Sequence, residues 1–529
     1  MIWVDREIAK IKSLHRAKQG VHPEGSPRGE WFDDMKTPSG RIHVGALRGV
    51  VIHDLLYKVL LENNVKAKFT YVFEDHDPMD AIPSYLDQKK WGKYAGMQLY
   101  KVPSPEKGYK NYAEFYANEF QKVFESINCH PEIIWLSQLY LTGKMNGVVK
   151  EILNATPKIR EIYLKITKKP RSADWHPFNV VCENCQKVGT TFVYKWDGKN
   201  VHYRCQPNMV AWAKGCGHEG KVSPYDGRGK IPWKVEWAAK WKVIGVTVEG
   251  AGKDHMSAGG SHDIASAICK EVLDYPVPYP VPYEWFTIGG KKMSSSKGIG
   301  ASAKEVSQIL PPDVFRFFIV RTPIGTALDF HPYGDSILHI FDDYDRCLNA
   351  YFDKLENKIP EKKQGEVTLE FARIIELSQV RPLPQKRLFL PRFRTVVNLI
   401  KAKTDILSLF EKQKKSKLSA EEKEILEERV VFAESFLKNN SQPQVHFDLS
   451  INQSKFLKEL AVALSQEKPK TRESIQSVLF DTLKQGNYKP KEAFQVLYRV
   501  LIGQDFGPKA GDLIFDTGID TVIKKLQKN

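Results

Sequence analysis

The residues best suited to chemistry lie in two short segments that are far apart in the chain. The first segment runs Thr37-Pro38-Ser39-Gly40-Arg41-Ile42-His43-Val44-Gly45-Ala46. Its turn residues stand between a short strand-like segment at 31–35 and a stretch with apolar residues at helical spacing, so the spacing predicts a helix that begins near His43 and Gly45. The first amides of a helix lack partners within it and attract phosphate. Gly45 would let a nucleotide phosphate approach, and His43 would donate a hydrogen bond.

The second segment is a basic loop flanked by glycines. It runs Gly289-Gly290-Lys291-Lys292-Met293-Ser294-Ser295-Ser296-Lys297-Gly298. Its ammonium groups, hydroxyls and amides suit a polyphosphate, although a lysine cluster taken alone is more typical of a solvated surface. A glycine-histidine helix start taken alone is equally compatible with an ordinary strand-to-helix turn. The two segments together predict a nucleotide site.

The two segments resemble the signature motifs of class I aminoacyl-tRNA synthetases. The HIGH motif appears as His43-Val44-Gly45-Ala46 and the KMSKS motif as Lys292-Met293-Ser294-Ser295-Ser296. Ala46 replaces the second histidine and Ser295 the second lysine, with Lys297 placed to cover the lost charge. Together with the segment 252–261, the motifs resemble class I lysyl-tRNA synthetases over about residues 1 to 345.

The resemblance implies which residues bind ATP and which take part in catalysis. The implied catalytic residues are His43, Lys292, Ser295 and Lys297, with Mg²⁺ assisting. The implied ATP-binding residues are Thr37, Pro38, Ser39, Gly40, His43, Gly45, Ala46, Lys292, Met293, Ser294, Ser295 and Ser296. The reaction would be activation of L-lysine to lysyl-adenylate, followed by transfer of the lysyl group to the terminal adenosine of tRNA(Lys).

The bulk composition is compatible with this function. The 529 residues carry a net charge of +16, which favours a polyanionic partner such as nucleic acid or an acidic membrane surface. A basic charge that serves only solubility is the alternative. No apolar run is long enough to cross a bilayer and the first residues do not resemble a signal peptide, so we expect a cytoplasmic protein with no membrane partner. The sequence does not determine the oligomeric state, and we expect a monomer.

The predicted fold class is α/β, with a Rossmann-like parallel-sheet catalytic domain, a zinc-binding insertion and an α-helical tRNA-binding domain at the C-terminus. Apolar runs predict strands at 68–73, 133–136 and 243–249. We expect the catalytic domain to occupy residues 1–170 and 226–290, separated by an insertion at 171–225. The KMSKS loop and a tRNA stem-contact region would follow at 291–360. Residues 361–529 would form an anticodon-binding domain, for which an oligomerisation domain is the alternative.

Four cysteines in one short region predict a structural zinc site. Cys182 and Cys185 form a Cys-x-x-Cys pair, and Cys205 and Cys216 follow within the same run of short strands. Four thiolates complete a tetrahedral Zn²⁺ site that leaves no open position for catalysis. The wide spacing of the second pair leaves His218 as an alternative to Cys216.

A pocket for the lysine side chain is expected from acidic and aromatic residues near predicted strand ends. Asp75 and Asp77 follow the strand at 68–73, where open parallel sheets bind ligands, although a metal site and a cap for the next helix are the alternatives. Trp237 lies on a helical face of tryptophans beside Glu236, which suits a methylene stem and its ammonium but also an ordinary core. Asp254 and His255 lie in a loop expected after the strand at 243–249 and would bind the other polar groups of the substrates.

Three other functions remain compatible with the sequence. The altered motif positions Ala46 and Ser295 allow an RNA-binding protein that derives from a synthetase but does not charge tRNA. The cysteines allow a zinc-dependent nucleic-acid-binding protein with an incidental α/β domain. A class I synthetase for another amino acid would share the scaffold, although acidic residues in the pocket disfavour an acidic substrate.

Overall fold

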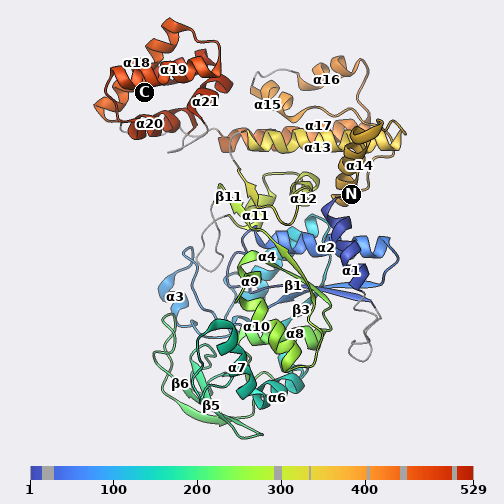
Figure 1. Cartoon of the computed structure of the whole chain (residues 1–529), viewed down its shortest axis with the longest axis vertical. Helices are drawn as coiled ribbons and strands as arrows, with labels where there is room; N and C mark the ends of the chain where they lie inside the picture. The colour runs from blue at the N-terminus through green and yellow to red at the C-terminus, as the bar shows by residue number, and fades with distance from the viewer. Residues whose placement is uncertain are drawn as a thin grey trace. The chain divides into compact units, whose positions relative to one another are not determined.

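The computed structural model describes residues 2–14, 29–290, 301–332, 335–401, 405–440, 449–502 and 509–527. The chain divides into two compact units, residues 1–435 and 436–529, and each is described by itself (Figure 1). Residues 291–300 lie outside the described residues, so the structure gives no placement for six predicted site residues: Lys292, Met293, Ser294, Ser295, Ser296 and Lys297.

A parallel five-stranded sheet organises the first unit and confirms the predicted α/β fold. Its strand order is β10-β9-β1-β2-β3. The strands are β1 (Glu30–Lys36), β2 (Ala67–Phe73), β3 (Glu132–Trp135), β9 (Val248–Gly252) and β10 (Tyr279–Tyr283). The strand order reverses between β1 and β9, and open α/β sheets bind ligands at the carboxyl ends of the strands beside such a switch point.

Helices connect the strands and cover both faces of this sheet. From β1 the chain passes through α2 (Ala46–Glu62) to β2 and then through α4 (Tyr112–Ser126) to β3. From β9 it passes in the opposite direction through α10 (Ser261–Glu271) to β10. Such connections are right-handed, so α2 and α4 cover one face and α10 covers the other. The helix α8 (Trp233–Ile244) lies beside α10 in Figure 1.

The strand predicted at 243–249 is wrong in its bounds. Residues 243 and 244 end α8, and Gly245 closes that helix in the left-handed region at φ 96°. A glycine adopts this conformation without the strain that a side chain would bring, so the helix can end there. The strand β9 begins at Val248, and the loop expected at 250–255 is the end of β9 followed by the short helix α9 (Lys253–Met256).

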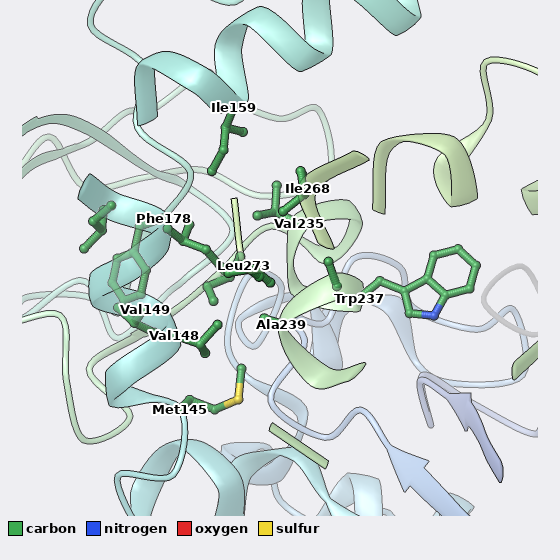
Figure 2. Packing of buried hydrophobic residues seen from close by; sticks show 14 of the residues in the cluster. Met145, Val148, Val149, Ile159, Phe178, Val235, Trp237, Ala239, Ile268 and Leu273 are labelled. Carbon is green, nitrogen blue, oxygen red and sulfur yellow. The ribbon is translucent and has the colours of Figure 1, made fainter. Parts of the chain in front are cut away.

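One apolar core packs α8 and α10 against α5 (Leu136–Leu141), α6 (Asn146–Asn154) and α7 (Thr156–Thr167). Figure 2 shows Val148 and Val149 of α6 facing Val235 and Ala239 of α8. Trp241 of α8 is fully buried in this cluster. The core therefore fixes α8, which carries the tryptophans expected in the substrate pocket.

The segment between α7 and α8 forms small antiparallel sheets. One pairs β4 (Asn179–Val180) with β8 (Gly229–Lys230), and the other has the order β5-β6-β7, with β5 (Thr191–Trp196), β6 (Val201–Cys205) and β7 (Glu219–Val222). Three further helices precede β3 in the chain: α1 (Trp3–Leu14), α3 (Gln88–Gly92) and the 3₁₀ helix η2 (Leu99–Lys101).

After β10 the first unit continues through a two-stranded parallel sheet into helices. The sheet pairs β11 (Phe286–Ile288) with β12 (Leu328–Phe330). The helices are α11 (Ala303–Ser307), α12 (Pro312–Val320), α13 (Ser336–Leu355), α14 (Lys362–Leu377), α15 (Phe393–Lys401), α16 (Ile406–Lys414) and α17 (Ala420–Asn440). Phe317 of α12 packs with Leu348 of α13 and Ile375 of α14.

The elements that the structure describes in the second unit beyond α17 are helices joined by short turns. Its helices are α18 (Ile451–Glu467), α19 (Arg472–Gln485), α20 (Pro490–Ile502), α21 (Ala510–Thr517) and α22 (Ile519–Gln527). They enclose an apolar core that includes Leu460, Leu479 and Leu497. Within the residues that the structure describes, no helix combines the length and the apolar character needed to cross a membrane.

Candidate active site

A pocket of about 840 Å³ opens at the carboxyl ends of β1, β2 and β9. It therefore lies at the switch point of the sheet, where the topology predicts a ligand site. Its lining includes nine of the residues that the sequence analysis singled out: Thr37, Ser39, His43, Gly45, Ala46, Asp77, Trp237, Asp254 and His255. Pro38, Gly40, Asp75 and Glu236 are not among the lining residues.

The predicted phosphate turn is present at the start of α2. Gly45 is the N-cap residue of this helix, and no side chain of the described residues caps it. The amides of Ala46 and Leu47 donate to the carbonyls of His43 (3.1 Å) and Val44 (3.0 Å), which folds the turn tightly into the helix. The positive end of the α2 dipole, with Gly45 and His43 beside it, thus faces the pocket.

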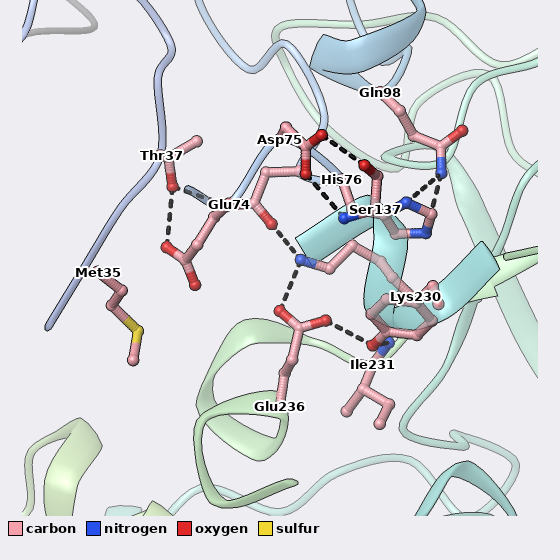
Figure 3. Close-up of polar contacts among 12 residues, drawn as sticks. Met35, Thr37, Glu74, Asp75, His76, Gln98, Ser137, Lys230, Ile231 and Glu236 are labelled. Carbon is pink, nitrogen blue, oxygen red and sulfur yellow. Dashed lines mark hydrogen bonds and ion pairs between the residues drawn. The ribbon is translucent and has the colours of Figure 1, made fainter. Parts of the chain in front are cut away.

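Two buried lysines neutralise most of the expected acidic cluster. Lys230 Nζ contacts Asp77 Oδ1 and lies 2.9 Å from Glu236 Oε2, as Figure 3 shows for the Glu236 contact. Lys240 Nζ lies 2.5 Å from Glu74 Oε1. These carboxylates raise the pKa of Lys230 despite its burial, so the lysine is charged. The chain's own ammonium groups therefore occupy the carboxylates that the sequence suggested for the substrate.

Asp75 and Glu236 have partners that account for their charges inside the protein. Asp75 accepts hydrogen bonds from the amide (2.7 Å) and the hydroxyl (2.5 Å) of Ser137, near the start of α5 (Figure 3). The cap on the next helix that the sequence left as an alternative is not formed by Asp75, because Asp87 caps α3 and Asp75 bonds the distant Ser137. Glu236 is fully buried and accepts from the Tyr140 hydroxyl at 2.5 Å. Glu236 does not line the pocket itself, but its ion pair with Lys230 holds a residue that does.

The structure places two buried strand carboxylates in the pocket lining, which sequence reasoning missed. Asp34 belongs to β1 and Glu249 to β9. Burial raises the pKa of Asp34 to about 7 and that of Glu249 to about 8. The available signal was a carboxylate within a strand of a parallel sheet, because burying a charge is costly unless it has a function or a partner.

The two missed carboxylates differ in their partners. Glu249 accepts from the indole nitrogens of Trp237 (2.7 Å) and Trp241, so its oxygens are engaged. Asp34 accepts from the Met35 amide at 2.8 Å. His53 Nδ1 lies 3.9 Å from Asp34, but burial lowers the pKa of His53 to about 4, so this ring is neutral. In the described part of the chain, no lysine or arginine nitrogen lies within 4.0 Å of Asp34.

Aromatic rings and polar groups from three elements form the wall around α9. The ring of His255 lies edge-on to Trp233 (5.6 Å between centroids) and to Trp237 (6.0 Å). The Trp285 indole donates to Asp254 Oδ1 at 2.9 Å. All five residues line the pocket. The predicted tryptophan wall therefore faces the cavity at Trp233 and Trp237, whereas Trp241 is part of the core.

Comparison with known proteins decides the family. A family model described as "tRNA synthetases class I (K)" matches residues 1–381, and one described as "Anticodon binding domain" matches residues 391–529. The chain belongs to the class I tRNA synthetases. The matches place the α2 turn, the pocket and β11 within the synthetase part, and α15 to α22 within the anticodon-binding part.

The alignments with relatives of this class I synthetase cover nearly its whole length. The "Lysine--tRNA ligase" of Methanosphaera stadtmanae is 30% identical over 517 residues, which cover 92% of this chain and 94% of the relative. The protein of the same name from Methanocaldococcus jannaschii is 30% identical and covers 99% of both. Among solved structures, the methionyl-tRNA synthetase of Mycobacterium tuberculosis is 11% identical, covers 92% of this chain and 93% of its own, and overlays with a TM-score of 0.36. Nothing below rests on that loose overlay.

The cysteine cluster of the synthetase has the geometry of a four-thiolate metal site. The Sγ atoms of Cys182, Cys185, Cys205 and Cys216 all lie within 4.8 Å of one another. Cys182 and Cys216 are 3.6 Å apart, as are Cys185 and Cys205, close to the edge of about 3.8 Å in a tetrahedron with Zn–S bonds of about 2.3 Å. His218 is not part of this group. The four thiols could hold a metal ion and fit the geometry of Zn²⁺, and Cys216 rather than His218 completes the group.

Proposed function

We propose that this synthetase activates L-lysine with ATP and transfers the lysyl group to the terminal adenosine of tRNA(Lys). The observation that carries the proposal is the single pocket at the sheet's switch point, which joins the α2 turn to a tryptophan wall and buried carboxylates. A positive turn suits a nucleotide phosphate, and rings with a carboxylate suit a cationic side chain on an apolar stem. Relatives named lysine–tRNA ligase support the choice of amino acid.

In this proposal the enzyme needs no general base for activation. The lysine carboxylate is ionised at neutral pH and can attack the α-phosphate of ATP directly, forming the mixed anhydride as pyrophosphate leaves. Catalysis then consists of alignment and of stabilising the negative charge that develops on the phosphates. We assign this charge stabilisation to His43 and the Gly45 amide on the α2 turn, to Lys292, and to Mg²⁺ bound with ATP. On the basis of the sequence motif alone, we also propose that Ser295 and Lys297 contact the phosphates of ATP.

We further propose that Asp34 receives the ε-ammonium of the substrate. The other pocket carboxylates near the strand ends already face Lys230, Lys240 or tryptophan indoles. Asp34 is buried at the pocket wall, and a bound ammonium would supply the cation that it lacks there. Trp237 would cover the methylene stem. Asp254 and His255, in α9, would bind the α-amino group, the carboxylate or the ribose.

The remaining assignments concern the metal, the tRNA and the cellular setting. We propose that Cys182, Cys185, Cys205 and Cys216 hold a structural Zn²⁺, which would fix the insertion but take no part in the reaction. The α-helical part after residue 390 is proposed to bind the anticodon end of the tRNA. The net charge of +16 favours that partner. We propose a cytoplasmic location and a monomer as the working state.

Aminoacylation of total tRNA with each radiolabelled amino acid in turn, with ATP and Mg²⁺, tests this function. The tRNA must be present throughout, because related class I enzymes can require it for activation. Charging with lysine alone is the expected result. Charging with another amino acid would be compatible with a class I synthetase but would refute the assignment of the pocket to lysine. Binding of tRNA with no charging and no ATP turnover would refute the enzyme and favour an RNA-binding protein that derives from a synthetase.

A further inference from the structure

One buried arginine links the phosphate-turn helix to the two chain segments that lead into β11 and β12. Arg48 lies in the first turn of α2, and only 1% of its surface is exposed. Its Nη1 donates to the carbonyl of Trp285 at 2.9 Å. Its Nη2 donates to the carbonyls of Pro323 at 3.0 Å and Thr326 at 2.7 Å. All these partners are backbone groups, so the contacts fix the path of the main chain.

The segments that Arg48 holds are the ones that approach the pocket. Trp285 lines the pocket and donates to Asp254, and β11 follows directly at Phe286. The Leu328 amide at the start of β12 also donates to the Trp285 carbonyl, at 2.8 Å. From β11 the chain runs through Gly290 into the Lys-Met-Ser sequence. Arg48 therefore fixes the point from which that sequence departs.

The chain that returns from the Lys-Met-Ser sequence is attached to the same turn. The Val44 amide donates to the Ala301 carbonyl at 3.2 Å, and the Ala303 amide donates to the Ile42 carbonyl at 2.9 Å. His43 and Ser302 form an antiparallel bridge between them. Residues on both sides of 291–300 are thus tied to the start of α2, one by main-chain pairing and the other through Arg48.

We propose that Arg48 is a positioning residue for the activation step, which sets the separation between the phosphate turn on α2 and the segment from Trp285 to Gly290. The proposal rests on the function proposed above. A guanidinium can serve both segments because its five N–H groups form a rigid planar fork, whereas a lysine ammonium is a point donor on a flexible stem. Burial lowers the pKa of Arg48 to about 10, which leaves it charged at neutral pH.

Arg316 of α12 provides a matched control, because it contacts the same helix α2 as a buried guanidinium. It is equally buried, and its Nη2 lies 2.6 Å from Asp54 Oδ2 of α2. Its other donors reach the carbonyls of Ile127 and Leu377, at 2.9 and 3.2 Å. None of these partners lines the pocket. Arg316→Lys therefore removes a buried guanidinium that contacts α2 without removing any hydrogen bond to the Trp285 segment.

The test compares Arg48→Lys with Arg316→Lys in lysine-dependent ATP–pyrophosphate exchange with tRNA present. We expect kcat to fall by about 10- to 100-fold in Arg48→Lys, because a misplacement near 1 Å is enough for such a loss, while KM for lysine and ATP stays within about threefold. Arg316→Lys should keep a kcat within about threefold of wild type, although both variants should unfold at lower temperature. Equal kcat values in the two variants, whether wild-type or reduced, would overturn the proposal.

Hydrogen exchange separates this proposal from the proposed function. In Arg48→Lys the amides of β11 and β12 should exchange faster than in wild type, and in Arg316→Lys they should not. A wild-type protein that fails to activate lysine would refute the proposed function, while this measurement would still decide the role of Arg48. Unchanged protection of β11 and β12 in Arg48→Lys would overturn the positioning role.

Discussion

Replacing Asp34 with asparagine should make the protein more stable, and the gain should grow with pH. Burial raises the pKa of Asp34 from an ordinary 3.8 to about 7. Between these values the native state holds a proton that the unfolded chain has lost, so its stability falls as the pH rises toward 7. Three pKa units correspond to about 4 kcal/mol, of which about 2 kcal/mol is lost between about pH 5.5 and pH 8. Asparagine keeps the shape and the Oδ1 acceptor but does not titrate.

Urea unfolding of wild type and Asp34→Asn, followed by tryptophan fluorescence at about pH 5.5 and pH 8, measures this difference. Asp174→Asn is the control, because Asp174 is exposed. The Asp34→Asn variant should gain about 2 kcal/mol relative to wild type between the two pH values, and the control should gain nothing. A gain that does not change with pH would show that Asp34 is already ionised in the free protein.

The same variant tests the assignment of Asp34 to the substrate. If an ammonium binds there, the KM for lysine in wild type should fall as the pH rises from about 6 to 8, because the carboxylate ionises in that range. In Asp34→Asn this dependence should disappear, and KM should rise by about 10- to 100-fold for the loss of a charge-assisted hydrogen bond. A stability change without any effect on KM would leave Asp34 a structural residue and refute its contact with lysine.

Three further predictions follow from the turn, the cysteines and α2. His43→Ala and Lys292→Ala should each lower kcat for ATP–pyrophosphate exchange by about 100-fold or more, and rates within a few-fold of wild type would refute their role in stabilising charge on the phosphates. Cys216→Ser should lose Zn²⁺, measured by atomic absorption, and should unfold at lower temperature; retention of one zinc per chain would contradict Cys216 as a ligand. Gly49→Ala should destabilise the protein despite the helix preference of alanine, because its Cβ would lie 2.7 Å from the oxygens of two buried side chains, whereas Gly147→Ala, with no atom within 4 Å, should be neutral or stabilising by up to about 1 kcal/mol.

Much of the fold could be predicted from local sequence patterns. The strand–turn–helix at β1 and α2 follows from turn residues between a short strand-like segment and helical spacing, and the structure confirms it. The strand predicted at 243–249 began five residues too early, because apolar residues near Gly245 suit both the end of a helix and the start of a strand. The glycine's left-handed conformation, which ends α8, could not be recognised from periodicity alone.

The sequence predicted those parts of the candidate site whose functional residues lie together in one segment. Asp77 was correctly placed at a strand end that lines the pocket, but its pairing with Lys230 could not be foreseen. Those two residues are 153 positions apart, and the β4–β8 pairing is what brings Lys230 to the sheet edge. Asp34 was overlooked because a carboxylate in a strand gives no indication of which neighbours will surround it.

By itself, the sequence determined the features that depend on neighbouring residues: the phosphate turn with Gly45 and His43, the cysteine spacing, and the motifs that identify the family. Only the tertiary structure decided which carboxylates already have a cation and which residue remains for the substrate. The physical reason is that burial and ion pairing act through space. The charge state of Asp34, Glu236 or Lys230 depends on segments that the fold brings together from distant parts of the chain.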